Sequence, residues 1–170
     1  METKAYIRCA LFAALTAAAA QIAIPIGPVP INLALLPVFL SGSLLGAKYG
    51  FLSQLAYLLL GACGLPVFTL FRGGLPVFAG PTGGYLWGYL LIALLAGRKR
   101  AGQNPAALAL HMLMGLLALY ALGSGWFMIS TGSGFWETLG LCVLPFMPGD
   151  FLKIITACLV TKRLKGISED

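Results

Sequence analysis

Two charged residues, Asp150 and Lys153, lie three positions apart inside the last long apolar segment of the chain. This spacing places both side chains on one face of a helix, and the preceding Pro148-Gly149 is typical of a helix start that the aspartate can cap. An ionisable side chain at membrane depth is expensive, so it usually faces a cavity and has a function. The pair therefore predicts a site for a polar ligand. The alternative is an ion pair that only stabilises the helix.

A stretch rich in glycine and proline, residues 66–84, is the second candidate site. It contains Arg72, and its end forms the sequence Gly-Pro-Thr-Gly-Gly-Tyr over residues 80–85. Glycine lets a backbone approach a ligand closely, and irregular backbone at membrane depth is tolerated where it lines a cavity. No Gly-Lys-Ser/Thr follows, so the stretch is not a Walker A motif, and we predict that this chain does not itself hydrolyse ATP. The alternative is a flexible connector.

Small residues recur on one face of the first apolar segment. They form several Ala-xxx-Ala pairs and are Ala10, Ala13, Ala14, Ala17 and Ala18. Such a face permits close contact between helices in lipid. The pattern predicts a packing surface, either for a partner or for a neighbouring helix of the same chain.

Catalytic and metal chemistry have little support in the sequence. His111 is the only histidine and has no cysteine or carboxylate nearby in the chain, whereas a metal site needs several ligands. The four cysteines form no Cys-x-x-Cys pair and are interpreted as apolar filler. We predict no cofactor, no metal and no enzymatic activity. A membrane-embedded enzyme using the charged pair or His111 is the alternative, and it would need a second catalytic group.

The composition indicates what surrounds these residues. Charged residues make up 9% of the chain and hydrophobic residues 59%, with a mean hydropathy of +0.93. A water-soluble fold could not cover such a sequence with polar surface, so lipid must be its solvent. The net charge of +6 comes from basic clusters between apolar runs, which is the pattern of membrane topology rather than of nucleic-acid binding.

The chain contains six apolar segments that we compare with the length of about 20 residues that one membrane-spanning helix needs. They cover residues 6–24, 31–45, 51–65, 85–96, 105–122 and 136–160. A small-residue loop with Trp126 is predicted at 123–134, and Pro145 and Pro148 interrupt the last segment. We therefore predict an all-α polytopic membrane protein with six transmembrane helices, in which residues 1–170 form one transmembrane substrate-binding domain.

The basic residues predict the orientation. If the chain starts inside, nine of the eleven lie on that side: Lys4, Arg8, Lys48, Arg98, Lys99, Arg100, Lys162, Arg163 and Lys165. The positive-inside rule then places both termini on the cytoplasmic side of a multi-pass protein of the cytoplasmic membrane. The two exceptions are Arg72, in the outer stretch, and Lys153. A cleaved signal peptide is the alternative for the first segment, but the charge pattern favours a retained helix.

Four runs of residues together resemble the BioY family, the biotin-binding membrane subunits of energy-coupling-factor transporters. They are Pro28-Val29-Pro30, Gly-Ala-Cys-Gly-Leu-Pro-Val-Phe at 61–68, Gly-Pro-Thr-Gly-Gly-Tyr at 80–85 and Leu-Pro-Phe-Met-Pro-Gly-Asp-Phe-Leu-Lys at 144–153. The resemblance covers nearly the whole chain, in order and in spacing. It implies six helices with both termini cytoplasmic, and a biotin pocket near the outer face that the outer loops close.

The resemblance also implies partners and contact residues. The partners would be biotin, membrane lipid, a transmembrane coupling subunit and two ATP-binding-cassette ATPases, with no nucleic acid. The residues expected at the biotin site are Asp150, Lys153, Asn32, Arg72, Phe68, Gly80, Thr82, Tyr85 and Trp87. The residues expected to contact the coupling subunit are Ala13, Ala14, Ala17 and Ala18.

The chemistry of biotin suits these side chains. Asp150 can accept from the ureido N–H groups, and Lys153 can donate to the ureido oxygen or to the carboxylate. The fork of Arg72 suits the carboxylate, and Asn32 offers both a donor and an acceptor. Aromatic side chains, Tyr89 among them, are candidates for the wall around the apolar ring. A related subunit for another small vitamin-like solute is the alternative within transport.

Overall fold

The computed structural model describes residues 2–25, 29–98 and 104–169, with side chains described as far as Leu164. The helices are α1 Glu2–Gln21, α2 Leu35–Leu45, α3 Ala47–Ala62, α4 Pro76–Ala79, α5 Gly83–Ala96, α6 Pro105–Thr131, α7 Phe135–Cys142 and α8 Met147–Glu169. A 3-10 turn, η1, covers Thr69–Phe71. The strands β1 Ala23–Ile24 and β2 Ile31–Asn32 form a short antiparallel pair. The prediction of an all-α fold is confirmed.

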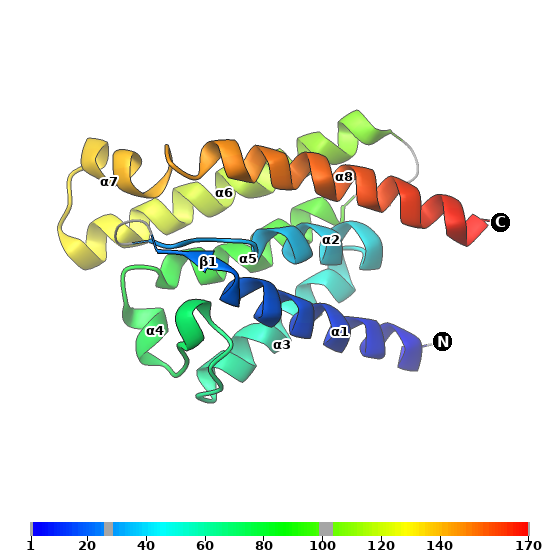
Figure 1. Ribbon diagram of the computed structural model, residues 1–170, viewed down its shortest axis with the longest axis horizontal. Helices are drawn as coiled ribbons and strands as arrows, with labels where there is room; N and C mark the ends of the chain where they lie inside the picture. The colour runs from blue at the N-terminus through cyan, green and yellow to red at the C-terminus, as the bar shows by residue number, and fades with distance from the viewer. Residues whose placement is uncertain (1, 26–28, 99–103, 170) are drawn as a thin grey trace.

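The long helices run side by side along the long axis of the molecule (Figure 1). Both termini lie at one end of this bundle, together with the ends of α2 and α5 (Figure 1). The opposite end carries β1, α4 and α7 (Figure 1). The short elements and the loops that join them therefore gather at the end away from the termini, where they cover the open end of the helix bundle.

Helix α6 is longer than the sequence indicates. The loop predicted at 123–134 is wrong for 123–131, because the helix continues to Thr131 and ends at Gly132, which has a φ of +73°, so that only 132–134 connect it to α7. The small residues that suggested a loop instead allow close packing of α5 on α6. A side chain at Gly123 would overlap the ring of Tyr85, and the indole N–H of Trp126 donates to the carbonyl oxygen of Gly80 at 2.9 Å.

The last predicted segment consists of two helices. Helices α7 and α8 are bent by 51° at the break between Cys142 and Met147, where Pro145 stands. Because a proline lacks the N–H that a continuous helix needs, the break falls where the sequence predicts an interruption. Because α8 starts after this break, Asp150 lies in the first turn of α8, at the covered end of the bundle.

Membrane crossing is tested by helix length and composition. One described helix, Pro105–Thr131, is long and apolar enough to span a membrane, and the bent pair Phe135–Cys142 and Met147–Leu164 passes the same test as a single span. Helices α2 and α5 are apolar but have only 11 and 14 residues. At 1.5 Å per residue they are about 17 and 21 Å long, shorter than a hydrocarbon core of about 30 Å. The number of six spans stays a prediction.

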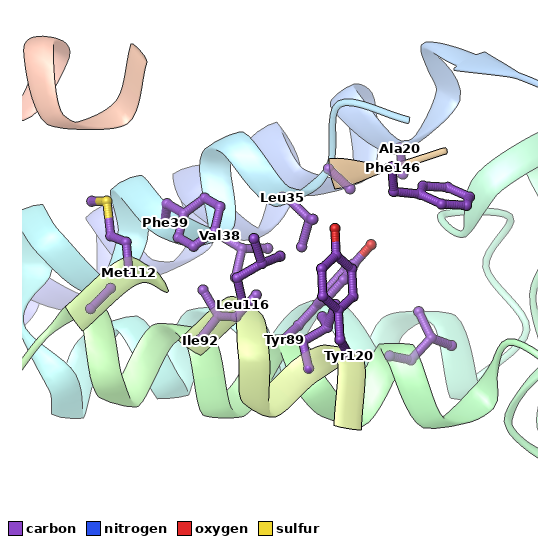
Figure 2. Packing of buried hydrophobic residues seen from close by; sticks show 14 of the residues in the cluster. Ala20, Leu35, Val38, Phe39, Tyr89, Ile92, Met112, Leu116, Tyr120 and Phe146 are labelled. Carbon is purple, nitrogen blue, oxygen red and sulfur yellow. The ribbon is translucent and has the colours of Figure 1, made fainter. Parts of the chain in front are cut away.

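The core closes the middle of the bundle. Val38 and Phe39 of α2, Ile92 of α5 and Met112 and Leu116 of α6 are almost completely buried, and Figure 2 shows them packed together between these helices. This apolar layer separates the end that carries the termini from the covered end. Any ligand site at the covered end therefore has a closed floor.

Candidate functional site

The covered end of the bundle encloses a cavity of about 160 Å³. Its polar or polarisable lining consists of Asn32, Thr69, Arg72, Thr82, Tyr85, Tyr89, Tyr120, Cys142, Asp150 and Lys153. Its apolar lining consists of Pro25, Val29, Pro30, Leu35, Phe68, Leu70, Val77, Leu86, Leu119 and Phe146. Apolar walls with a few convergent polar groups are the usual makeup of a small-molecule site.

The charged pair of α8 lies at this cavity and is buried. The ammonium of Lys153 donates to Oδ1 of Asp150 at 2.7 Å, and the two residues are 7% and 1% exposed. The hydroxyl of Tyr120, on α6, donates to the other carboxylate oxygen, Oδ2, at 2.6 Å. Each carboxylate oxygen thus has one protein partner and room to accept a second hydrogen bond. An ammonium has three N–H groups, so Lys153 keeps donors for a ligand.

Two tyrosines from neighbouring helices form part of the wall beside this pair. Tyr89 of α5 and Tyr120 of α6 are both nearly buried, and their hydroxyl groups point to the same side, near Leu35 and Phe146 (Figure 2). The rings add apolar surface while the hydroxyls add polar contacts. A ligand in this cavity meets an apolar slot with its polar groups concentrated at one place.

The segment from Phe68 to Arg72 forms another wall. Phe68 is 2% exposed, and its ring packs edge-on against the rings of Tyr57 and Phe78. Arg72 is exposed and also lines the cavity. The amide of Asn32 donates to the hydroxyl of Thr69 at 2.8 Å. This wall therefore has a buried aromatic base and a cation at its solvent-accessible edge.

Seven of the nine residues predicted for the site line this one cavity. They are Asp150, Lys153, Asn32, Arg72, Phe68, Thr82 and Tyr85. Gly80 and Trp87 are not part of the lining. Trp87 is 46% exposed on the outside of α5, where its ring lies against Phe78. The carbonyl of Gly80 is occupied by the Trp126 indole, so both residues support the walls from outside.

Sequence reasoning missed several residues at the cavity. Tyr120, Leu35, Cys142 and Phe146 line it, and none was singled out. The only available signal was the hydroxyl of Tyr120 within an apolar run, because a phenol in lipid needs a hydrogen-bond partner. Its partner is 30 residues away in the sequence, so no local pattern identifies it.

The alanine face of α1 divides in two. Ala13 is 2% exposed and belongs to the core, and Ala17 packs against the core. Ala10, Ala14 and Ala18 are exposed. Of the four alanines predicted to contact a partner, Ala14 and Ala18 are exposed, Ala17 is partly exposed and Ala13 is buried.

His111 lies away from the cavity, on α6. Its Nδ1 atom is 2.6 Å from the carbonyl oxygen of Ala107, one turn earlier in the same helix. Among the residues that the structure describes, no three or more His, Cys, Asp or Glu side chains gather as a metal site would require.

Known proteins share both the sequence and the fold. The model of the BioY family matches residues 1–170. The probable biotin transporter BioY of Pyrococcus horikoshii is 43% identical over 166 residues, which cover 98% of this chain and 99% of the relative. The biotin transporter BioY of Thermotoga maritima is 41% identical over 163 residues, which cover 95% of each chain.

A solved structure has the same architecture. It is the crystal structure of the S-component for biotin from an ECF-type ABC transporter, and it superposes with a TM-score of 0.90 at 31% sequence identity. The match covers 97% of this chain and 92% of that chain.

Proposed function

The chain belongs to the BioY family, as its motifs predict, and from this premise we propose that it is the high-affinity biotin-binding subunit of an energy-coupling-factor uptake transporter. The family is one of transport proteins, not of enzymes. The observation that carries the proposal is the buried Asp150–Lys153–Tyr120 cluster at an apolar-walled cavity. Residues 1–170 act as one substrate-binding domain.

Biotin matches the cavity group by group. Its ureido ring has two N–H donors and one carbonyl acceptor, which suit the carboxylate of Asp150 and the ammonium of Lys153. The thioether ring and the aliphatic chain are apolar and suit walls such as Phe68, Leu86 and Phe146. Bonds to charged groups are about twice as strong as neutral ones, so the cluster supplies both affinity and orientation.

The proposed orientation of biotin in the cavity follows from which charged side chains are buried and which are exposed. The Asp150–Lys153 pair is buried, whereas Arg72 is exposed at the edge of the same cavity. A carboxylate is costly to bury without a partner, and a guanidinium fork is its geometric match. The ureido ring therefore lies against the buried pair, and the carboxylate lies at Arg72.

The membrane arrangement is part of the proposal. The chain crosses the cytoplasmic membrane six times, with both termini on the cytoplasmic side and the cavity facing outward. The supports are nine basic residues assigned to one side by sequence and two termini at one end of the bundle (Figure 1). Because basic loops are retained inside, these supports favour an arrangement in which the opposite end, with β1, α4 and α7, lies outside.

The partners are a transmembrane coupling subunit and two ATP-binding-cassette ATPases. Ala14 and Ala18 lie one turn apart on the exposed face of α1, which allows another helix to approach closely in lipid. Their exposure supports α1 as the docking helix. Ala13 and Ala17 serve the packing of the chain itself.

Isothermal titration of purified protein with biotin tests the function and the site. Asp150→Asn and Lys153→Met should each weaken binding by about 30- to 4,000-fold, because truncating one partner of a buried, hydrogen-bonded charge pair at a binding site costs about 2–5 kcal/mol. Thr156→Ala, on the exposed face of the same helix, is the matched control and should bind like the wild type. Wild-type affinity in both variants would remove the site assignment.

A ligand panel separates biotin from other vitamins. Biotin, thiamin, riboflavin and queuosine are titrated into the same preparation, and only biotin should bind tightly. Tight binding of another solute with no biotin binding would contradict the proposed substrate while leaving the transport family unaffected.

A further inference from the structure

One wall of the cavity has an unusual backbone. Phe68 and Arg72 pair with each other, with N···O distances of 2.9 and 3.2 Å. Between them Leu70 and Phe71 have φ values of 61° and 56°. Residues other than glycine rarely adopt backbone angles in this left-handed region. Such angles persist only where contacts with the surrounding structure hold the backbone in place. Something outside the turn must hold residues 66–72 in place.

Gln21, at the end of α1, makes most of the side-chain contacts that hold this turn. Its Nε2 donates to the carbonyl oxygens of Val67 and Phe68 at 3.2 and 3.1 Å. Its Oε1 accepts from the backbone N–H of Phe71 at 2.9 Å. The partners are 46 to 50 residues away in the sequence. One side-chain amide thus hydrogen-bonds to backbone groups before and after the left-handed residue Leu70.

Two other side chains among the described residues hydrogen-bond to the segment, but neither bridges its two sides as Gln21 does. Tyr57 donates to the carbonyl of Val67 at 3.3 Å, and Asn32 donates to Thr69 at 2.8 Å. Asn32 lines the cavity, whereas Gln21 does not. A substitution at Gln21 therefore changes the wall without removing a group that a ligand can touch. A change in ligand binding in such a variant would therefore report the position of the wall, not the loss of a direct contact.

We propose that Gln21 is a positioning residue for the ligand site: it holds the 66–72 turn so that Phe68, Leu70 and Arg72 form the wall and edge of the cavity. The inference rests on the proposed function for the identity of the ligand, biotin. The turn itself does not depend on that identity. Without the amide, the left-handed residues relax toward commoner backbone angles, and the wall and the cation at its edge move.

The test compares Gln21→Met and Gln21→Glu with the wild type. Methionine keeps the length of the side chain and removes its hydrogen bonds. Glutamate keeps an acceptor for the Phe71 N–H but sets a carboxylate against the carbonyls of Val67 and Phe68. Ile22→Ala, at the exposed neighbouring residue, is the matched control. Three quantities are measured on the full chain in detergent: hydrogen exchange without ligand, biotin affinity with its dissociation rate, and the thermal midpoint.

We expect faster exchange in the peptide that contains Phe71, with the helices unchanged, for both variants. Biotin dissociation should accelerate by about tenfold in Gln21→Met, because the displaced wall weakens its contacts with the ligand by about the strength of one hydrogen bond, and by more in Gln21→Glu. A merely structural role would instead lower the thermal midpoint and raise exchange throughout the chain. Ile22→Ala should change none of the three quantities.

Two results would overturn the inference. One is unchanged exchange around Phe71 in Gln21→Met, and the other is faster exchange there with wild-type biotin affinity and dissociation. Failure of the proposed function has a different outcome. If the wild type binds no biotin yet exchange around Phe71 rises in both variants, the ligand is wrong and Gln21 still positions the turn.

Discussion

At the scale of single residues, the cavity places a balanced charge cluster where a lone charge would be costly. Asp150 and Lys153 neutralise each other at 2.7 Å, and Tyr120 satisfies the second carboxylate oxygen. A buried pair adds little net stability by itself. Its value lies in presenting oriented donors and acceptors to a ligand that also has both. Tyr120 fixes the carboxylate by occupying Oδ2, so its hydroxyl sets the geometry of the pair.

Tyr120→Phe tests this role of the hydroxyl. The variant leaves Oδ2 of Asp150 without its buried donor, a loss of about 1–3 kcal/mol, so biotin affinity should fall about tenfold. Isothermal titration measures the affinity, and a thermal melt in detergent measures the accompanying loss of stability. Tyr6→Phe, at an exposed tyrosine of α1, should leave both unchanged. Equal affinities for the two variants would contradict a role for Tyr120 in the site.

At the scale of elements, α1 packs in the bundle on one face, presents small residues on the other, and reaches the cavity wall at its end. Its inner face, with Ala13 and Thr16, is buried in the bundle, and its outer face presents Ala14 and Ala18. Its last residue, Gln21, reaches the wall of the cavity. A helix with a packed face and a free small-residue face suits docking to a second membrane helix.

Bulky residues on the outer face of α1 should separate binding from transport. Ala14→Trp prevents close approach of a partner helix but leaves the cavity intact. Cells that express the coupling module should lose most biotin uptake with this variant, while the purified subunit binds biotin within twofold of the wild type. Leu117→Trp, at an exposed position of α6 away from α1, is the control for bulk in lipid. Unimpaired uptake with Ala14→Trp would exclude this face as the docking surface.

At the scale of the whole molecule, the two ends differ in chemistry. The end with the termini carries the start of α1 and the end of α8 (Figure 1), whose basic residues there include Lys4 and Lys162, whereas Lys153 lies at the cavity. The other end carries the cavity and the short elements that cover it (Figure 1). Large apolar side chains such as Ile129, 84% exposed, face outward on the helices. This is the surface expected of a chain whose solvent is lipid.

Thiol labelling of intact cells tests the orientation. The four native cysteines are replaced, and a single cysteine is introduced as Glu137→Cys in α7 or as Lys162→Cys in α8, both exposed positions. A membrane-impermeant maleimide should label the first variant directly and the second only after permeabilisation. The reverse pattern would invert the proposed topology, and immediate labelling of both would refute a crossing between them.

Much of this protein is determined locally by its sequence. Long apolar runs require helices because lipid offers the backbone no hydrogen bonds, and a spacing of three brings Asp150 and Lys153 together on any helix. The motifs at 28–30, 61–68, 80–85 and 144–153 predicted the family, and the family model and the relatives confirm it. Seven of the nine predicted site residues line one cavity, although their contacts with biotin remain a prediction.

Only the tertiary structure decided the rest. Trp87 faces outward, Tyr120 faces Asp150, and Gln21 reaches a turn 50 residues further along. Helical periodicity tells which residues share a face, but not which neighbour that face meets. Glycines at 123–134 suggested a loop, whereas Gly123 packs against Tyr85 and lies within α6, which continues to Thr131. Contacts between distant segments depend on how the helices pack, and that packing is a property of the whole chain.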